Sequence, residues 1–229
     1  MPNGNDKPIE KQGLNALFRR HAPALGLALA VTLAILLPHY PPWHWASHTT
    51  GGDAAIHTYL INWGQHTLWT DPAEYFHAPT FYPEPYSTAR NAVNPVLSFV
   101  TAPLRLLGNP LLSYQFAMLL AALLCAAAMY GVAYGLLRHR RAAVLAAVVF
   151  AANSDIQFHI HGHPNIVAPY FAPVALLCLG KTRRTGNALW AAGLAGAVIG
   201  QLLSSWYLGF ITLFGLGAFW LVDVAVNRP

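Results

Sequence analysis

Two short polar stretches in a largely apolar chain carry side chains that could do chemistry. The first begins with Asp53, near the start of a helix expected over residues 52–69, and His57 follows one turn later. The second stretch holds one carboxylate and three alternate histidines: Asp155, His159, His161 and His163. A carboxylate can take the proton of a hydroxyl that lies within hydrogen-bond reach. Alternate imidazoles on an extended segment project to one side, where they can bind Zn, Cu or Ni.

Each of these groups also has a plainer interpretation. Asp53 lies in the first turn of its helix, where Asp is common and where the helix dipole stabilises an anion. If the second stretch is helical, only His159 and His163 are aligned, four residues apart. Histidines in a polar loop are also often only solvated or hydrogen-bonded. Metal binding by the three histidines and a purely structural role therefore both stay open.

The composition of the chain predicts which elements position these residues. Of the 229 residues, 55% are hydrophobic and only 9% are charged, whereas soluble domains carry about 25% charged residues. A membrane-crossing helix needs about 20 mostly apolar residues. Seven apolar stretches are candidates: 22–40, 94–107, 110–137, 142–158, 166–180, 187–204 and 207–226. The sequence therefore predicts an all-α fold, a polytopic transmembrane helical bundle.

The stretch 94–107 is expected to lie at the membrane interface, because it contains two prolines and an arginine. Basic residues support this assignment, since they concentrate on the cytoplasmic side of membrane proteins. With the N-terminus inside and 94–107 outside, 11 of the 13 Lys and Arg residues are cytoplasmic. If 94–107 crossed, the basic clusters at 138–141 and 181–184 would move outside. We therefore expect six spans and a cytoplasmic N-terminus.

This topology divides the chain into a cytoplasmic segment, residues 1–21, and a transmembrane module, residues 22–229. Residues 41–109 form a long outer loop with interfacial helices, including the helix over 52–69. Five of the eight acids and nine of the eleven histidines then lie on the outer face, so chemistry is expected there. The net charge of +5 comes from short basic clusters at the ends of apolar stretches, a pattern typical of topology signals. We therefore expect no nucleic-acid partner.

This order of features resembles the GT-C class of polytopic bacterial glycosyltransferases. The resemblance is carried by Gly-Gly-Asp at 51–53 after the first span, by the stretches 81–120 and 161–184, and by QLLSSWYLGF at 201–210. It implies an inverting enzyme of the bacterial cytoplasmic (inner) membrane. Such an enzyme moves a sugar from a polyprenyl-phosphate donor to an acceptor at the outer face. The implied partners are that lipid-linked sugar and membrane lipid, and a divalent metal is a candidate cofactor.

The resemblance also assigns roles to the two acids. Asp53 matches the catalytic base of the first outer loop, and Asp155 matches a second acid that joins the site. His57, on the same helix edge as Asp53, is a candidate for substrate binding. Many members of the class carry paired acids in the first outer loop, whereas Asp53 has no acidic neighbour.

Three further residues are candidates for substrate binding. Arg90 and Arg105 are the only Lys or Arg residues on the expected outer face, and a guanidinium matches the oxygens of a phosphate. An alternative interpretation of Arg105 is that its side chain only extends from an interfacial helix towards water. Glu84 lies in a turn-prone Pro-rich loop and is either structural or substrate-facing.

Two other classes of function are compatible with such a bundle. A transporter or lipid flippase would carry charged groups at mid-membrane and broken helices in matching halves, but few mid-span charges and no internal repeat are visible. A non-catalytic membrane subunit would fit the absence of paired acids. Members of the GT-C class are usually much longer than this chain, which is consistent with a fragment of a longer protein.

Overall fold

The structure, a computed structural model, describes residues 14–44, 52–80, 83–90 and 93–226. These residues form nine α-helices and four short 3-10 helices, with no strand among them. The α-helices are α1 (Leu14–Leu36), α2 (Asp53–Thr70), α3 (Pro95–Thr101), α4 (Pro110–Leu137), α5 (Arg140–Ala151), α6 (Ser154–His159), α7 (Ala172–Thr185), α8 (Ala188–Ser204) and α9 (Trp206–Val226). The 3-10 helices are η2 (Pro42–His44), η3 (Pro72–Phe76), η4 (Ser87–Arg90) and η5 (Ala102–Leu107). The predicted all-α class is confirmed for this part of the chain.

Four of the α-helices begin at an asparagine whose side-chain oxygen accepts a hydrogen bond from a backbone N–H of the first turn. The capping residues are Asn94 for α3, Asn109 for α4, Asn153 for α6 and Asn187 for α8. The first N–H groups of a helix have no partner within the helix, and leaving them unsatisfied away from water is costly. These asparagines therefore define where the helices start in a chain that is largely apolar.

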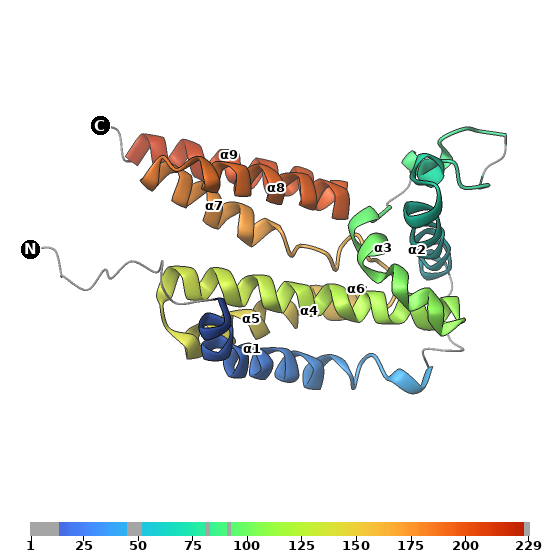
Figure 1. Ribbon diagram of the computed structural model, residues 1–229, viewed down its shortest axis with the longest axis horizontal. Helices are drawn as coiled ribbons and strands as arrows, with labels where there is room; N and C mark the ends of the chain where they lie inside the picture. The colour runs from blue at the N-terminus through green and yellow to red at the C-terminus, as the bar shows by residue number, and fades with distance from the viewer. Residues whose placement is uncertain (1–13, 45–51, 81–82, 91–92, 227–229) are drawn as a thin grey trace, which may run out of the picture.

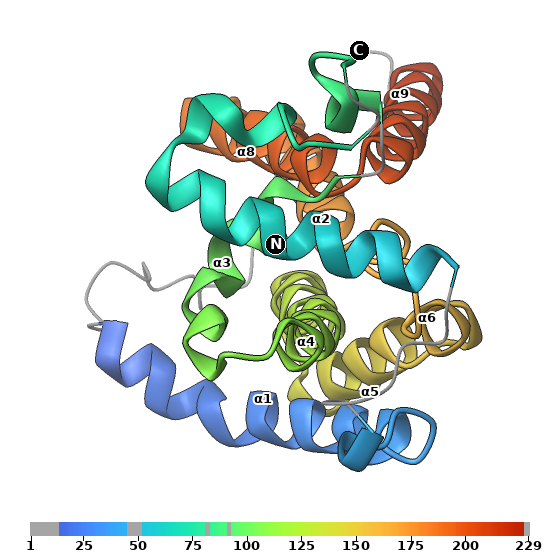
Figure 2. The same cartoon turned by 90° about the vertical axis from the view of Figure 1, so that its right-hand side faces the viewer.

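Helix α4 is the centre of the bundle. Its inward residues are fully buried and mostly small, including Ala117, Ala121, Ala122 and Cys125, so neighbouring helices can approach closely. Helices α1 and α5 pack on one side of α4, and α7, α8 and α9 form a second layer on the other side (Figure 1). Viewed from one end, α2 runs crosswise beside the end of α4 (Figure 2).

Helix α2 spans almost the same residues as the helix predicted from the sequence. The expected helix over 52–69 is observed as Asp53–Thr70, and Asp71 follows it as the C-terminal cap. Thr58 and Gln65 lie seven residues apart and so share one polar side of this helix, yet both are buried, with exposed fractions of 7% and 1%. The reason is that the end of the bundle offers polar partners for this side of α2.

Those partners surround the Gln65 amide. Its Nε2 donates to Thr101 Oγ1 at 2.9 Å, and its Oε1 accepts from the Ser113 hydroxyl at 2.9 Å. Gln65 therefore joins α2 to the end of α3 and to the first turn of α4. A buried amide satisfied on both sides fixes orientation, because sliding α2 would break both bonds.

Three helices are long and apolar enough to cross a membrane: Arg19–Leu36 within α1, α4, and α9. Helix α8 is apolar but has only 17 residues. The expected interfacial stretch 94–107 forms α3 and η5, and each is far shorter than a span. The described part of the chain is therefore compatible with a membrane protein that crosses the bilayer more than once.

Two expected spans are not continuous helices. The stretch 142–158 is divided into α5 and α6, because Asn153 Nδ2 donates to the Phe150 carbonyl at 2.7 Å while its Oδ1 caps α6. The stretch 166–180 is helical only from Ala172 onward. Prolines at 164 and 169 disfavour the helical conformation in the residues before them. Residues 160–171, hereafter the 160–171 segment, therefore form an irregular connection between α6 and α7.

Candidate functional site

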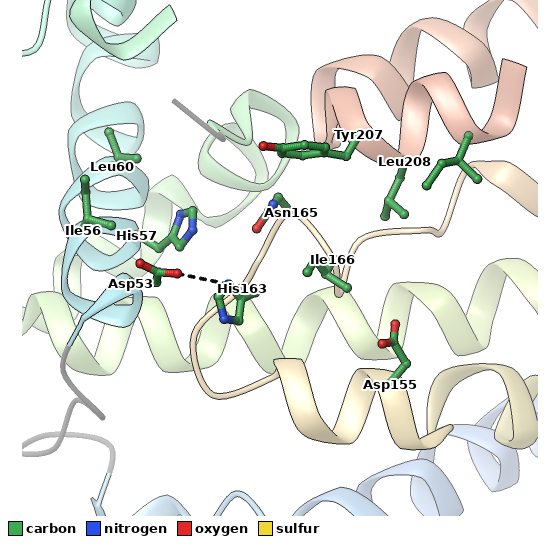
Figure 3. A pocket seen from close by; sticks show the side chains of 11 residues that line it. Asp53, Ile56, His57, Leu60, Asp155, His163, Asn165, Ile166, Tyr207 and Leu208 are labelled. Atoms are coloured by element: carbon green, nitrogen blue, oxygen red, sulfur yellow. Dashed lines mark ion pairs between the residues drawn. The ribbon is translucent and has the colours of Figure 1, made fainter. Parts of the chain in front are cut away.

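A cavity of about 690 Å³ lies between the start of α2, helix α6 with the 160–171 segment, and the start of α9 (Figure 3). It is lined by Asp53, Ile56, His57, Leu60, Asp155, His163, Asn165, Ile166, Tyr207, Leu208 and Ile211. Four of the candidate residues from the sequence are thus brought to one cavity: Asp53, His57, Asp155 and His163. They come from stretches that lie about a hundred residues apart in the sequence.

Asp53 is the first residue of α2 and stands at the edge of the cavity. Gly52 precedes it with φ of 53°, a backbone conformation that favours glycine. The Asp53 side chain is 71% exposed, and its Oδ2 lies 3.8 Å from His163 Nδ1. Asp53 is therefore a solvent-accessible carboxylate that faces an imidazole.

The second acid is connected to the first through two imidazoles. His163 and His159 have ring centroids 5.0 Å apart, and His159 Nε2 lies 3.5 Å from Asp155 Oδ1. Asp53, His163, His159 and Asp155 therefore form a continuous series of carboxylate, imidazole, imidazole and carboxylate. The two ends of the series are ion-pair contacts, and its middle is an edge-to-face contact between the two rings.

The three predicted histidine ligands do not converge. His163 N donates to the His159 carbonyl at 2.9 Å, so the chain makes a helical turn here, which is the alternative that aligns only His159 and His163. His161 instead packs on Tyr40, with ring centroids 5.5 Å apart. Within the described ranges, no group of three or more His, Cys, Asp or Glu side chains is arranged to hold a metal ion.

Two buried polar groups face the same cavity (Figure 3). His57 and Asn165 are each 7% exposed, and His57 Nδ1 and Asn165 Oδ1 have no hydrogen-bond partner within the described chain. A buried polar atom without a partner costs about 1–3 kcal/mol. Both atoms are therefore places where a bound molecule could make hydrogen bonds.

The charge state of His57 follows from its surroundings. The pKa of His57 is lowered from 6.5 to about 4, first by burial and second by His163, while the Asp53 carboxylate partly offsets these two effects. The imidazole is therefore neutral near pH 7, with one nitrogen that donates and one that accepts. The cavity thus combines a neutral imidazole, an amide and two accessible carboxylates.

The 160–171 segment is held in place by a buried glutamine of α8. Gln201 is 0% exposed. Its Nε2 donates to the Ala168 carbonyl at 2.9 Å, and its Oε1 accepts from the N–H groups of Phe171 and Ala172 at 3.1 and 3.0 Å. Non-helical backbone inside an apolar bundle needs such partners. Gln201 therefore positions the segment that carries His163 and Asn165.

The other predicted substrate-binding residues lie elsewhere. Arg105 Nη1 is 3.0 Å from His66 Nδ1 on the exposed side of α2. Glu84 lies in an exposed turn, and the side chain of Arg90 is outside the described residues. As far as the chain is described, neither Glu84 nor Arg105 lines the cavity, and no Lys or Arg does. A phosphate in this cavity would therefore meet two imidazoles, an amide, a tyrosine and two carboxylates.

Sequence reasoning did not find Asn165 or Tyr207. Asn165 follows the last histidine in His-Pro-Asn, and Tyr207 is the second residue of α9, next to Trp206. The only indication in the sequence was their position, because the expected topology places both residues in turns on the outer face. The rings of Trp206 and Tyr207 stack with centroids 3.8 Å apart, so Tyr207 presents a fixed aromatic side chain to the cavity.

The described geometry thus places accessible carboxylates, a neutral histidine, an amide and an aromatic ring around one space. Apolar side chains of α2 and α9, among them Ile56, Leu60 and Ile211, complete its walls. Such a mixture is typical of a cavity that binds an amphipathic molecule. Comparison with protein-family models, with curated proteins and with solved structures finds no match to this chain.

Proposed function

We propose that this protein is a glycosyltransferase of the bacterial inner membrane, which moves a sugar from a polyprenyl-phosphate donor to an acceptor hydroxyl at the outer face. One observation carries the proposal. Asp53 of the expected first outer loop and Asp155 of the expected second outer loop line the same cavity, beside apolar walls. A lipid-linked sugar needs this combination, because its tail stays in the bilayer while its head group lies at the surface.

In the proposed reaction Asp53 is the base. Its exposed carboxylate takes the proton of the acceptor hydroxyl, as general-base catalysis requires. The acceptor oxygen forms a bond to C1 of the sugar while the bond from C1 to the phosphate oxygen breaks, and polyprenyl phosphate leaves with the electron pair of that bond. The sugar passes through an oxocarbenium-like state, which the nearby negative charge of Asp155 favours. His163, between the two acids, orients the Asp53 carboxylate. The free polar atoms of His57 and Asn165 bind the hydroxyls of the sugar.

The proposed topology has six spans and a cytoplasmic N-terminus. Helices α1, α4, α8 and α9 supply four spans, the pair α5–α6 supplies one, and α7 with the preceding 160–171 segment supplies one. Irregular backbone at membrane depth is tolerated where protein covers it, and Gln201 satisfies part of the segment. This arrangement puts the 690 Å³ cavity at the outer end of the bundle.

The test is sugar transfer by the full chain in vesicles, from a panel of polyprenyl-phosphate-linked hexoses and pentoses. Substituting Asp53→Asn keeps the size of the side chain but removes the base, so turnover is expected to fall by about 10²–10⁴-fold. Asp71→Asn is the matched control, because Asp71 is an exposed acid that follows the same helix. Unchanged turnover in Asp53→Asn would end its assignment as the base.

A further inference from the structure

A second cavity, of about 430 Å³, lies at the opposite end of the molecule from Asp53. It is lined by Met129, Val132, Gly135 and Leu136 of α4, by Pro173, Leu176, Leu177, Gly180, Lys181 and Arg184 of α7, and by Phe219 of α9. The ends of these three helices meet at the end of the bundle far from α2 (Figure 1). This space is hereafter called the α4–α7 groove.

The α4–α7 groove is apolar along most of its length. Its lining residues on α7 run from Pro173 to Arg184, which corresponds to about 16 Å along a helix at 1.5 Å per residue. Half of the hydrocarbon core of a bilayer is about 15 Å thick. The groove is therefore about as long as one leaflet, which is the length of a single acyl chain lying beside α7.

Two cations stand at one end of the α4–α7 groove. Lys181 and Arg184 both line it, whereas Arg183 between them is occupied by Asp223, with Nη1 and Oδ2 2.7 Å apart. In the part of the chain that the structure describes, Lys181 and Arg184 have no carboxylate within ion-pair distance. Among the described residues, no carboxylate therefore neutralises the charge of Lys181 and Arg184.

We propose that the α4–α7 groove binds an anionic phospholipid. The phosphate lies against Lys181 and Arg184, and one acyl chain lies along the apolar wall towards Pro173. Charge complementarity selects this occupant, since a phosphate diester supplies the anion that the two cations lack. This site is independent of the proposed transferase reaction, because it lies at the other end of the bundle.

Gly180 offers a way to fill the groove without changing its charge. A Cβ built at Gly180 meets nothing within 4 Å, so Gly180→Leu places a side chain in the space of the acyl chain. The double variant Lys181→Gln/Arg184→Gln removes the cations and leaves the space open. Gly215→Leu on α9 is the matched control, because a Cβ there also meets nothing within 4 Å and Gly215 does not line the groove.

The experiment is native mass spectrometry of the full chain in detergent, titrated with phosphatidylglycerol or with phosphatidylcholine. We expect phosphatidylglycerol to bind at least about tenfold more tightly than phosphatidylcholine. Both Gly180→Leu and the double variant should weaken phosphatidylglycerol binding by about tenfold, the effect of losing about 1.4 kcal/mol. Gly215→Leu should bind like the unchanged protein.

Three results would overturn the proposal. Equal affinity for the two lipids would show that the cations do not recognise a phosphate anion. Phosphatidylglycerol binding that survives Gly180→Leu would place the lipid outside the groove. A change from dimer to monomer in Gly180→Leu, seen in the same spectra, would identify a second copy of this chain as the occupant.

Discussion

At the scale of single residues, the cavity near Asp53 depends on a histidine that stays uncharged. The imidazole of His57, on α2, is buried, and its ring centroid lies 6.2 Å from that of His163. A charged His57 would place a cation in a poorly solvated space. The neutral ring instead keeps a hydrogen-bonding atom free for a ligand, while His163 alone faces the Asp53 carboxylate.

This arrangement predicts a pH-dependent stability. The pKa of His57 is about 4 in the folded protein against 6.5 for the free group. Between these values the unfolded chain binds more protons, so His57 destabilises the fold as pH drops from about 6.5 to 4. The loss by pH 4.5 is about 2–3 kcal/mol.

The measurement compares the thermal unfolding midpoints of the protein and of His57→Gln in detergent, at pH 7 and pH 4.5. The unchanged protein should lose more stability on acidification than the variant, which lacks the titrating ring. Equal losses would mean that His57 does not carry the pH dependence. Acids elsewhere titrate in both proteins, so the difference isolates His57.

At the scale of elements, α2 sits closely on its neighbours because of one glycine. A Cβ at Gly64 would lie 2.6 Å from Ser98 Oγ and 2.8 Å from Tyr75 Cε2. These side chains belong to α3 and η3, so α2 rests directly on both elements. Asp53 and His57 are carried by the same helix and move whenever this contact changes.

Substituting Gly64→Ala should therefore destabilise the protein by about 1–3 kcal/mol, the usual cost of overpacking a close contact. Gly131→Ala in α4 is the control, since its Cβ meets nothing within 4 Å and alanine has the higher helix propensity. Denaturation midpoints of the two variants, followed by tryptophan fluorescence, should move in opposite directions. A Gly64→Ala midpoint equal to that of the unchanged protein would contradict the close packing.

The 160–171 segment gives a second prediction at this scale. Substituting Gln201→Leu leaves the carbonyl of Ala168 and the N–H groups of Phe171 and Ala172 without their partner. Each unsatisfied buried group costs about 1–3 kcal/mol, so local opening should become at least about tenfold more frequent. Hydrogen exchange of the peptide 165–172 should speed up accordingly, while that of 110–125 in α4 should not change. Unaltered exchange at 165–172 would show that Gln201 does not hold the segment.

The sequence indicated some elements well and others poorly, for physical reasons. The long apolar stretches that became α4 and α9 leave little alternative to a helix, and the stretch 52–69 has clear start and stop signals. Asn153 was not recognised as a break within 142–158, because a single capping residue is weak evidence against a continuous apolar pattern. Gln65 and Gln201 form hydrogen bonds with segments that are distant in the sequence. These bonds depend on tertiary packing, which a single sequence does not reveal.

The candidate site was foreseeable only in part. Asp53, His57, Asp155 and His163 were singled out by residue type, and the structure brings them to one cavity. Arg105 was chosen as a phosphate ligand from its charge alone, and it lies on His66 instead. Asn165 and Tyr207 are common residue types in turns, so nothing local distinguished them.

At the scale of the whole molecule, the two cavities divide the bundle into ends of different character. The end near α2 carries acids and histidines, and the end near the α4–α7 groove carries Lys181, Arg183 and Arg184. Basic residues concentrate on the cytoplasmic side of membrane proteins. The distribution of charge therefore agrees with the proposed orientation, in which Asp53 faces out.

This orientation can be tested by labelling single cysteines in intact cells with a membrane-impermeant thiol reagent. Cysteines at positions 139 and 183 should stay unlabelled from outside, whereas one at the exposed position 84 should react. The native thiols Cys125 and Cys178 are buried and should give little background. External labelling at 139 or 183 would reverse the proposed topology.

The wall that α9 contributes to the Asp53 cavity has a consequence for biosynthesis. Helix α2 and its carboxylate leave the ribosome long before Tyr207 and Ile211, because chains are made from the N-terminus. Until α9 has been translated, the wall that Tyr207 and Ile211 contribute beside Asp53 and Asp155 is missing. Synthesis of α9 is therefore the event that completes the cavity.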